Sequence, residues 1–307
     1  MDLRQLSYFV ALATQQHYGK AAKVLHVAQP ALSRQIRLLE EELGLKLFER
    51  HARGATPTDE ARLLLDRAVF LLRYAEQTRQ DLLARQHEPR GPVAIGLSPG
   101  LAQQLTVMLT KAVLASLPEV RLRFIEGFAP SLQTMLSRGE VDVALLVEPV
   151  DHSNLSIVPL LEEQICLIGM PDDPRLRGET VQVRQLQGVP LVMTGLVRSG
   201  VRHELEAAAA RDGVALHQLV EVETAEVARR LVLEGLGLTV HFAAAVGEDI
   251  AAGRLRAVPI DGLFLQRSIA RAADRPPSKA TASVMALMRD LIRRHVEQGS
   301  WPNARLS

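Results

Sequence analysis

The sequence has little of several features that mark common protein classes. Cys166 is the only cysteine among 307 residues, so no intramolecular disulfide can form. Its place in the apolar run from Ile165 to Ile168 favours a buried, inert thiol over a redox sensor. The nine histidines are scattered, and none belongs to a His/Cys cluster with metal-ligand spacing, so no metal and no cofactor are expected.

A signal pattern and a long apolar run are also missing. No stretch approaches the ~20 residues of a membrane span. We therefore expect a cytoplasmic protein without a membrane partner. Aromatic content is only 4%, but 47% hydrophobic residues are enough for real cores, and the length suggests about two to three domains.

Net charge is nearly zero, yet it is unevenly spread. Residues 1–58 hold eight Lys and Arg against five Asp and Glu, residues 59–91 hold six against six, and the remainder holds 22 against 24. A mildly basic head on a near-neutral body is typical of a nucleic-acid-binding module joined to another domain. The asymmetry alone is too weak to identify DNA binding.

The stretch Ala21–Leu43 predicts two helices separated by a tight turn. The first helix is expected over Gly19–Leu25 and the turn at His26–Ala28. Pro30 opens the second helix, because its fixed φ and missing N–H suit a first helical position. One apolar stripe, which is expected to be buried, recurs in the second helix at steps of four, three and four: Leu32, Ile36, Leu39 and Leu43.

The opposite side of this second helix carries groups that can contact DNA. An amide, a hydroxyl and guanidiniums suit base edges and phosphates in a major groove. The carboxylates of Glu40–Glu42 would repel DNA, so the N-terminal half of the helix should enter the groove. An ordinary amphipathic hairpin with a solvated basic face is the alternative. The predicted contact residues are Gln29, Pro30, Ser33, Arg34 and Arg37.

The residues after this helix predict a wing and a long helix. Arg50 and Arg53 flank a turn at Arg53-Gly54, from which they can reach the DNA backbone or minor groove, although solvated loop arginines are the alternative. Thr58 is a candidate cap for a helix over Asp59–Arg85, ~40 Å long at 1.5 Å per residue. Its apolar spacing predicts a coiled-coil dimer helix, and Glu88–Pro92 forms a hinge.

The head resembles the LysR-type transcriptional regulators. The matching residues, in order, are Leu3-Arg4-Gln5-Leu6, Tyr8-Phe9, Ala21-Ala22, Gln29-Pro30-Ala31-Leu32-Ser33-Arg34-Gln35-Ile36, Leu43-Gly44, Leu47-Phe48-Glu49-Arg50 and Thr58. This resemblance implies DNA contacts by Gln29, Pro30, Ser33 and Arg34, with Arg53 on the wing. The chain departs from the family at Glu60-Ala61, where Ala-Gly is usual.

The body alternates strands and helices, which predicts parallel doubly wound units. The first unit is expected to have strands at Pro92–Leu97, Val120–Ile125 and Val141–Val147, with helices at Leu101–Leu117 and Pro130–Leu136. The second is expected to have strands at Gln164–Gly169, Pro190–Met193, Leu219–Val222 and Leu238–Val240, with helices at Gly200–Arg211 and Thr224–Glu234. A strand at Ser268–Ala272 and a helix at Ser283–Glu297 follow. The chain should cross between two lobes near Leu161 and Leu263, an arrangement that resembles periplasmic binding proteins.

The predicted fold class is therefore α+β and α/β multidomain. Residues 1–58 form a winged helix-turn-helix, residues 59–91 form the linker helix and hinge, and residues 92–307 form a two-lobed α/β effector domain. Lobe I covers about 92–161 and 264–297, and lobe II covers about 162–263. Body motifs resemble the nitrogen-assimilation-control-like branch of the family, with Phe242 standing where that branch commonly has proline; the motifs are Glu126-Gly127, Gly139-x-x-Asp142, Gly235-Leu236-Gly237 and Ala252-Gly253-Arg254-Leu255.

Ligands of open α/β folds bind at the carboxyl ends of strands, where helix N-termini present free amides. Arg198 suits a carboxylate but is equally explained as a solvated loop residue. Ser199 and Thr224 are at least N-caps, and for His241 a packing role is favoured over ligand binding. The predicted ligand residues are Ser98, Pro99, Gly100, Phe128, Ala129 and Glu148 in lobe I, and Thr194, Arg198, Ser199, Thr224 and His241 in lobe II.

Gly96–Gly100 also fits the G-x-S-x-G pattern of a hydrolase nucleophile elbow. The residue after the serine must donate its N–H to an oxyanion, and Pro99 has none. A solute-binding protein with a coincidental helical head is the second alternative, but it would need export.

We therefore expect a non-enzymatic regulator with a pseudo-palindromic DNA operator and a small, anionic effector. A homodimer assembling to a tetramer is expected, with RNA polymerase as a further partner.

Overall fold

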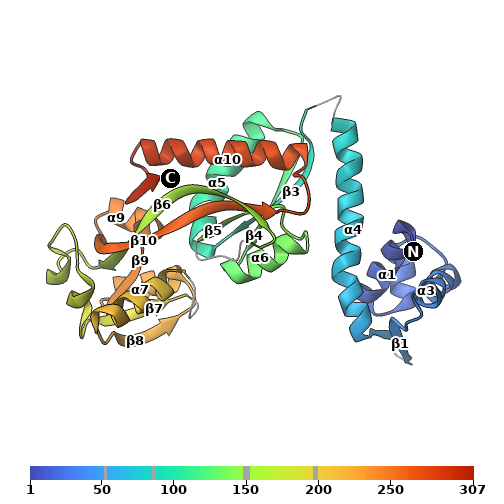
Figure 1. Cartoon of the computed structure of the whole chain (residues 1–307), viewed down its shortest axis with the longest axis horizontal. Coiled ribbons are helices and arrows are strands. Elements are labelled where there is room, and N and C mark those ends of the chain that lie inside the picture. Colours follow the sequence, from blue (N-terminus) through green and yellow to red (C-terminus); the bar gives the residue numbers. More distant parts are fainter. Residues whose placement is uncertain (52–53, 85–87, 148–152, 196–199) are drawn as a thin grey trace. The chain divides into compact units, whose positions relative to one another are not determined.

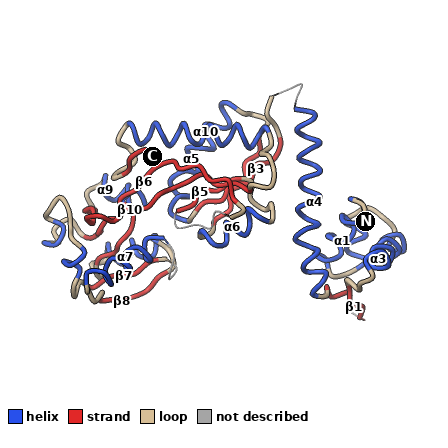
Figure 2. The backbone as a smooth tube through the Cα atoms, in the orientation of Figure 1, coloured by secondary structure: helices blue, strands red, loops and turns tan. Residues whose placement is uncertain are grey.

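The computed structural model describes residues 1–51, 54–84, 88–147, 153–195 and 200–307. Contacts divide the chain into two compact units. The first comprises Met1–His87 together with Arg138–Glu140, and the second comprises Glu88–Ser137 and Val141–Ser307. Figure 1 labels the elements of both units, and Figure 2 distinguishes their helices from their strands.

The first unit contains a helix-turn-helix head followed by a two-stranded wing, as predicted. A capping box starts the first helix, because the Asp2 carboxylate accepts from Gln5 N while the Gln5 side chain accepts from Asp2 N. The wing is antiparallel, with Phe48 opposite Pro57. The elements are α1 Leu3–Gln15, α2 Tyr18–Val24, α3 Gln29–Leu43, β1 Phe48–His51 and β2 Gly54–Pro57.

The predicted apolar stripe of α3 is buried except at its end. Leu32, Ile36 and Leu39 are fully buried in the head core, whereas Leu43 is 36% exposed. The prediction that Leu43 is buried is therefore wrong. Gly44 adopts a left-handed φ of 67° and ends the helix there, so the chain leaves the core at the last turn.

Helix α4 spans Asp59–Ala84 and belongs to the same unit. Thr58 marks its start, as predicted: its Oγ1 accepts from Ala61 N at 3.2 Å and donates to the Lys46 carbonyl at 2.9 Å. Ala61 and Ala68 are fully buried where α4 packs on α1. The departure from the family at Glu60-Ala61 thus places a small side chain in the head core. Arg85, the predicted helix end, lies outside the described residues.

Lobe I of the second unit is the predicted β-α-β-α-β arrangement. Its first strand pairs in parallel with both of the others. The C-terminal helix α10, Lys279–Glu297, packs on α5 and β3 (Figure 1). The elements are β3 Gly91–Leu97, α5 Pro99–Ser116, β4 Val120–Glu126, α6 Ala129–Ser137 and β5 Val143–Val147.

Lobe II repeats the parallel arrangement, with its first strand between the other two. Three short 3-10 helices and the short helix α9, Gly247–Ala251, complete this lobe; the sequence patterns do not predict them. The main elements are β7 Pro190–Thr194, α7 Gly200–Asp212, β8 His217–Val222, α8 Ala225–Leu233 and β9 Leu238–Phe242.

Two long antiparallel strands, β6 Leu155–Gly169 and β10 Arg256–Ala272, join the lobes into one sheet. They contain the crossing points predicted near Leu161 and Leu263, but they are far longer than the predicted strands. The strand order is β4-β3-β5-β10-β6-β9-β7-β8, and the short C-terminal β11, Ala304–Leu306, also pairs with β6. Figure 1 shows β6 and β10 running side by side.

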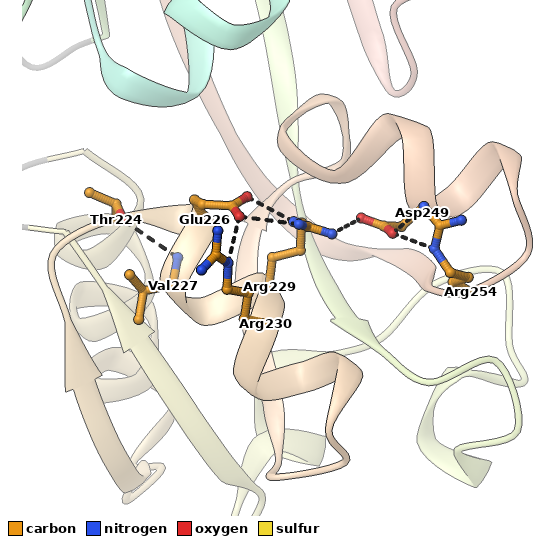
Figure 3. A network of polar contacts seen from close by, with 7 residues as sticks. All are labelled: Thr224, Glu226, Val227, Arg229, Arg230, Asp249 and Arg254. Atoms are coloured by element: carbon orange, nitrogen blue, oxygen red, sulfur yellow. Dashed lines mark hydrogen bonds and ion pairs between the residues drawn. The ribbon is translucent and has the colours of Figure 1, made fainter.

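A buried carboxylate ties α8 to α9 in lobe II (Figure 3). Asp249 is 2% exposed, and its oxygens lie 2.8 Å from Arg229 Nη1 and 2.7 Å from Arg254 Nε. Arg229 also bonds Glu226 at 2.8 Å, and this bond holds the pKa of the Glu226 carboxyl below its ordinary value. The bond between Arg229 and Asp249 therefore links the two helices.

Replacing Asp249 by alanine is expected to lower the free energy of unfolding of the second unit by about 1–3 kcal/mol, because charge-assisted hydrogen bonds are lost from a buried site. Fluorescence of Trp301, the only tryptophan and a buried residue of this unit, reports the transition in urea. Glu248→Ala, at the exposed neighbouring position, should change stability by less than about 0.5 kcal/mol. Equal losses in both variants would contradict the role of the network.

Candidate functional site

The outer face of α3 is open to solvent. Gln29, Pro30, Arg34 and Arg37 are exposed, and Ser33 is partly buried. An amide, a hydroxyl and guanidiniums therefore share the surface opposite the buried leucines, as the sequence predicts. Arg37 Nε lies 3.3 Å from Glu41 Oε1, so a carboxylate on the same helix already competes for this arginine.

The three glutamates that end α3 have separate partners within the head. Glu40 accepts hydrogen bonds from Leu47 N at 2.8 Å and Phe48 N at 3.1 Å, which joins the helix to the wing. Glu41 pairs with Arg37, and Glu42 pairs with the N-terminal ammonium. Glu40 thus links α3 to the wing, and the position of all three carboxylates keeps negative charge at the C-terminal end of α3.

The wing residues are only partly covered by the structure. Arg50 lies in β1, but its side chain is outside the described part, and Arg53 lies outside the described residues altogether. The wing is anchored to α1, because Ala55 N donates to the Gln16 carbonyl at 2.9 Å. The predicted arginine contacts remain predictions.

The second unit has a cavity of about 100 Å³ lined by residues of both lobes. Three helices begin at its wall: α5 with Gly100 and Leu101, α6 with Ala129, and α7 with Gly200. In α5 the first helical hydrogen bond runs from Ala102 N to the Ser98 carbonyl. The backbone N–H groups before Ala102 therefore have no acceptor within the helix. Helix N-termini carry partial positive charge, so the wall presents partial positive charge where these helices begin.

Several sequence-predicted ligand residues line this cavity: Ser98, Gly100, Phe128, Ala129, Thr194 and His241. Pro99 occupies the first position of α5 and is not part of the lining. Thr224 is also outside the lining and caps α8, with its Oγ1 accepting from Val227 N at 3.4 Å. Glu148, Arg198 and Ser199 lie outside the described residues.

The cavity lining also includes residues that were not among the predicted ligand residues: Gln104, Arg202, Phe242 and Arg267. Gln104 and Arg202 could have been found from helical spacing, because each lies within the first turns of a predicted ligand-facing helix. Arg267 gives no local signal, since it lies on the long crossing strand β10.

The two arginines among the described residues of the lining are nearly buried but differ in their partners. Arg202 is 7% exposed, with Nε 2.8 Å from Glu206 Oε1 and Nη1 2.8 Å from Glu221 Oε1. Arg267 is 4% exposed and forms an ion pair with Glu163, which is fully buried. Formal charges at the wall are therefore largely balanced within the protein.

His241 is a neutral member of the lining. Burial lowers the pKa of its imidazole to about 4, and the nearby Arg267 guanidinium acts in the same direction. The ring meets Phe242 edge-on, with 5.5 Å between centroids. Its Nδ1 is enclosed and has no hydrogen-bond partner among the described residues. The packing role favoured by the sequence is thus incomplete, because this nitrogen stays available at the cavity.

The depressed pKa of His241 has a defined effect on stability. Between its ordinary pKa of 6.5 and about 4, the unfolded chain binds a proton that the folded chain does not. The contribution of this pKa difference to stability is therefore fully present above pH 6.5. It is lost as pH falls toward 4, by about 1.4 kcal/mol per pH unit. Between pH 7 and pH 5, wild type should lose about 2 kcal/mol more than His241→Gln in urea unfolding followed by Trp301 fluorescence. Parallel losses would contradict this origin.

Other chemistries find little support in the described part of the chain. No cluster of three or more His, Cys, Asp or Glu there is arranged to hold a metal ion. Cys166 is fully buried, and burial raises the pKa of its thiol to about 11, so it is protonated at neutral pH. Among the described helices, none combines the length and apolar character needed to span a membrane.

Comparison with known families accounts for most of the chain. Residues 3–62 match the bacterial regulatory helix-turn-helix protein, lysR family, and residues 86–293 match the LysR substrate binding domain. Both matches agree with the predicted head and body. The relatives in this family are transcriptional regulators. The two family matches therefore contradict the hydrolase alternative and confirm the prediction of a non-enzymatic protein.

Individual relatives give the same result. The nitrogen assimilation regulatory protein nac of Klebsiella aerogenes is 33% identical over 241 residues, 78% of each chain, which supports the predicted branch. A full-length OxyR variant from Pseudomonas aeruginosa has a TM-score of 0.74 at 27% identity, covering 95% of both chains. CbnR in complex with its target DNA shares the fold, with a TM-score of 0.69 at 23% identity over 96% of this chain and 99% of that one. The chain belongs to the LysR family and is a DNA-binding transcriptional regulator with an effector-binding domain.

Proposed function

We propose that this regulator senses a small anion bound between the two lobes of its second unit. The observation that carries the proposal is the convergence of three helix N-termini on one cavity lined by both lobes. An anion there would interact with the positive ends of α5, α6 and α7 at once. A ligand that prefers one lobe arrangement shifts the population toward it, and this shift is passed to DNA binding.

For the DNA contacts, we propose that Gln29, Ser33 and Arg34 meet base edges in a major groove. Pro30 and Arg37 would lie beside the backbone, with Arg50 and Arg53 on the wing. The support is their common exposed face on α3, because the opposite face is committed to the core. The relative CbnR is described in complex with its target DNA, which agrees with this use of the head.

We further propose a homodimer that assembles to a tetramer on a pseudo-palindromic operator and contacts RNA polymerase. Support comes from α4, where Leu63, Leu71 and Leu82 are exposed apolar side chains on a helix of 26 residues. A second copy of the helix would cover them, and a twofold dimer matches a two-half-site operator.

A gel-shift titration on DNA upstream of its own gene tests the proposal. Binding is expected at low salt, and a screen of small carboxylates and amino acids by thermal shift should find anions that also alter the gel-shift affinity. Absence of DNA binding at low salt would overturn the DNA assignments. Metabolites that stabilise the protein without altering DNA affinity would overturn the sensing role.

Ser98 provides a directed test of the cavity. It is the N-cap residue of α5 but makes no side-chain cap hydrogen bond, so its hydroxyl remains available to a ligand. Ser98→Ala should weaken the metabolite response by about 5- to 10-fold, the value of one neutral hydrogen bond, and leave DNA affinity unchanged. Thr224→Ala removes a hydroxyl outside the lining and serves as the control. An unchanged response in Ser98→Ala would remove this residue from the site.

A further inference from the structure

Arg267 lies at an irregularity in the two strands that join the lobes. Arg267 pairs with Leu161, but the next pair is Ser268 with Pro159, so Leu160 is an extra residue on β6. Such bulges re-aim side chains and occur preferentially beside functional sites. The bulge lies at the wall of the cavity, where Arg267 is part of the lining.

The Arg267 guanidinium is held on two sides and left open on a third. Its Nε forms an ion pair with Glu163, which belongs to the other crossing strand, β6. Its plane lies over the Phe242 ring, with the guanidinium carbon 4.3 Å from the ring centroid. Its Nη1 is buried and has no hydrogen-bond partner among the residues that the structure describes.

A buried guanidinium nitrogen without a partner is costly in a protein interior. Glu163 does not satisfy this nitrogen, because its Oε2 accepts from Arg267 Nε and not from Nη1. The other oxygen of Glu163, Oε1, is also without a described partner. The other described cation of the lining, Arg202, has two countercharges, with carboxylate oxygens 2.8 Å from Nε and 2.8 Å from Nη1, although its Nη1 also lacks a well-aligned hydrogen bond. Among the described residues of the wall, Arg267 is therefore the cation that has a single countercharge and capacity for a further acceptor.

The surroundings define which acceptor fits. A carboxylate oxygen forms a stronger, charge-assisted bond to Nη1 than an amide or hydroxyl oxygen does. The rest of the described wall is mainly apolar, with Leu101, Phe128 and Val147 among its side chains, and the volume of about 100 Å³ favours small ligands. His241 adds no competing positive charge at neutral pH.

We propose that Arg267 is the specificity-determining anchor of the site, binding a small monocarboxylate with an apolar body through Nη1, and that Glu163 positions it. This inference rests on the proposed sensing function and names its ligand class. Because Arg267 and Glu163 come from the two strands that join the lobes, a ligand held by this pair acts directly on the connection between them.

The test uses the full-length protein and three probe acids, propionate, isovalerate and phenylacetate, each with its primary amide. Thermal shift followed by calorimetry gives the affinity of every probe at millimolar concentration. The carboxylates are expected to bind wild type, and the amides at least about 10-fold more weakly. Arg267→Gln should weaken carboxylate binding by about 10- to 100-fold and leave amide binding unchanged.

Three further variants keep the test interpretable. Arg267→Gln alone leaves Glu163 buried without its partner, so Glu163→Gln/Arg267→Gln is measured beside it, with the same expected loss. Arg271→Gln, on the same strand but outside the lining, is the matched control and should bind as wild type does. Glu163→Gln keeps an acceptor for Nε but removes the countercharge, so carboxylate binding should become tighter.

Each result bears on the assignment. Carboxylates that bind wild type and Arg267→Gln equally would overturn Arg267 as the anchor while leaving a sensing cavity in place. Equal binding of acids and amides, or no binding by any of the acids, would overturn the carboxylate class. Carboxylate binding in Glu163→Gln that is no tighter than in wild type would overturn the role given to the Glu163 charge. Failure of the proposed function itself would instead appear as DNA affinity that no bound probe or metabolite alters.

Discussion

Replacing Arg34 by alanine should weaken operator binding by about 10- to 100-fold and relax the preference among bases, the effect of losing about 1–3 kcal/mol at one base pair. Arg34 is exposed on the outer face of α3, in the half of the helix that precedes its glutamates. A guanidinium there can bond guanine acceptors bidentately. Gel shifts with the operator and single-base variants measure both the affinity and the preference.

Two variants make this result interpretable. Arg53→Ala should lower affinity uniformly across DNA sequences and reduce the salt dependence, as expected for a phosphate contact. Arg289→Ala, at an exposed position on α10 in the second unit, should leave DNA binding unchanged. Sequence-independent losses of equal size for Arg34→Ala and Arg53→Ala would contradict the major-groove assignment.

Gly54→Ala is expected to destabilise the head by about 3 kcal/mol or more, because steric overlap adds to backbone strain. Gly54 has a φ of 151°, and a β-carbon there would lie 2.2 Å from the Gln16 carbonyl oxygen. That oxygen accepts the bond from Ala55 N that anchors the wing to α1. Amide hydrogen exchange in α1 to α3 and operator affinity measure the loss.

Gly44→Ala is the matched control for this substitution. Gly44 also has a positive φ, 67°, but a β-carbon there meets no atom within 4 Å. Its cost should be only about 1–2 kcal/mol, the preference of a left-handed position for glycine. Unfolding monitored by Trp301 should be the same in both variants, because this residue reports the second unit. Equal losses in the stability of the head for the two variants would contradict this steric argument, because they would show that the backbone near Gln16 moves easily to accept the β-carbon.

The head was predictable because its information is local. Pro30 at a helix start, the spacing of Leu32, Ile36 and Leu39, and the Thr58 cap each fix structure within a few residues. The prediction that Leu43 is buried was wrong, because the periodicity of apolar residues does not show where the core ends. The roles of the three glutamates also escaped prediction, since Glu40 bonds amides of the wing that follow only after the helix has ended.

The body was predictable where strands and helices alternate and less so where strands cross. The strand ends and helix starts indicated Ser98, Ala129 and Thr194, which line the cavity, and their contacts to a ligand stay a prediction. The crossing strands were too short in the prediction, because β6 and β10 contain polar and proline residues that interrupt an apolar pattern. Their pairing across about 100 residues of sequence compensates for those interruptions.

The sequence by itself determined the family, the exposed polar face of α3 and the two-lobed body, because motifs and periodicity act over short stretches. Only the tertiary structure decided that Arg267 meets Glu163, Phe242 and the cavity. These residues lie on three different strands, and the bulge beside Arg267 depends on the register between two of them. Register is a property of paired strands, and no single stretch of sequence contains it.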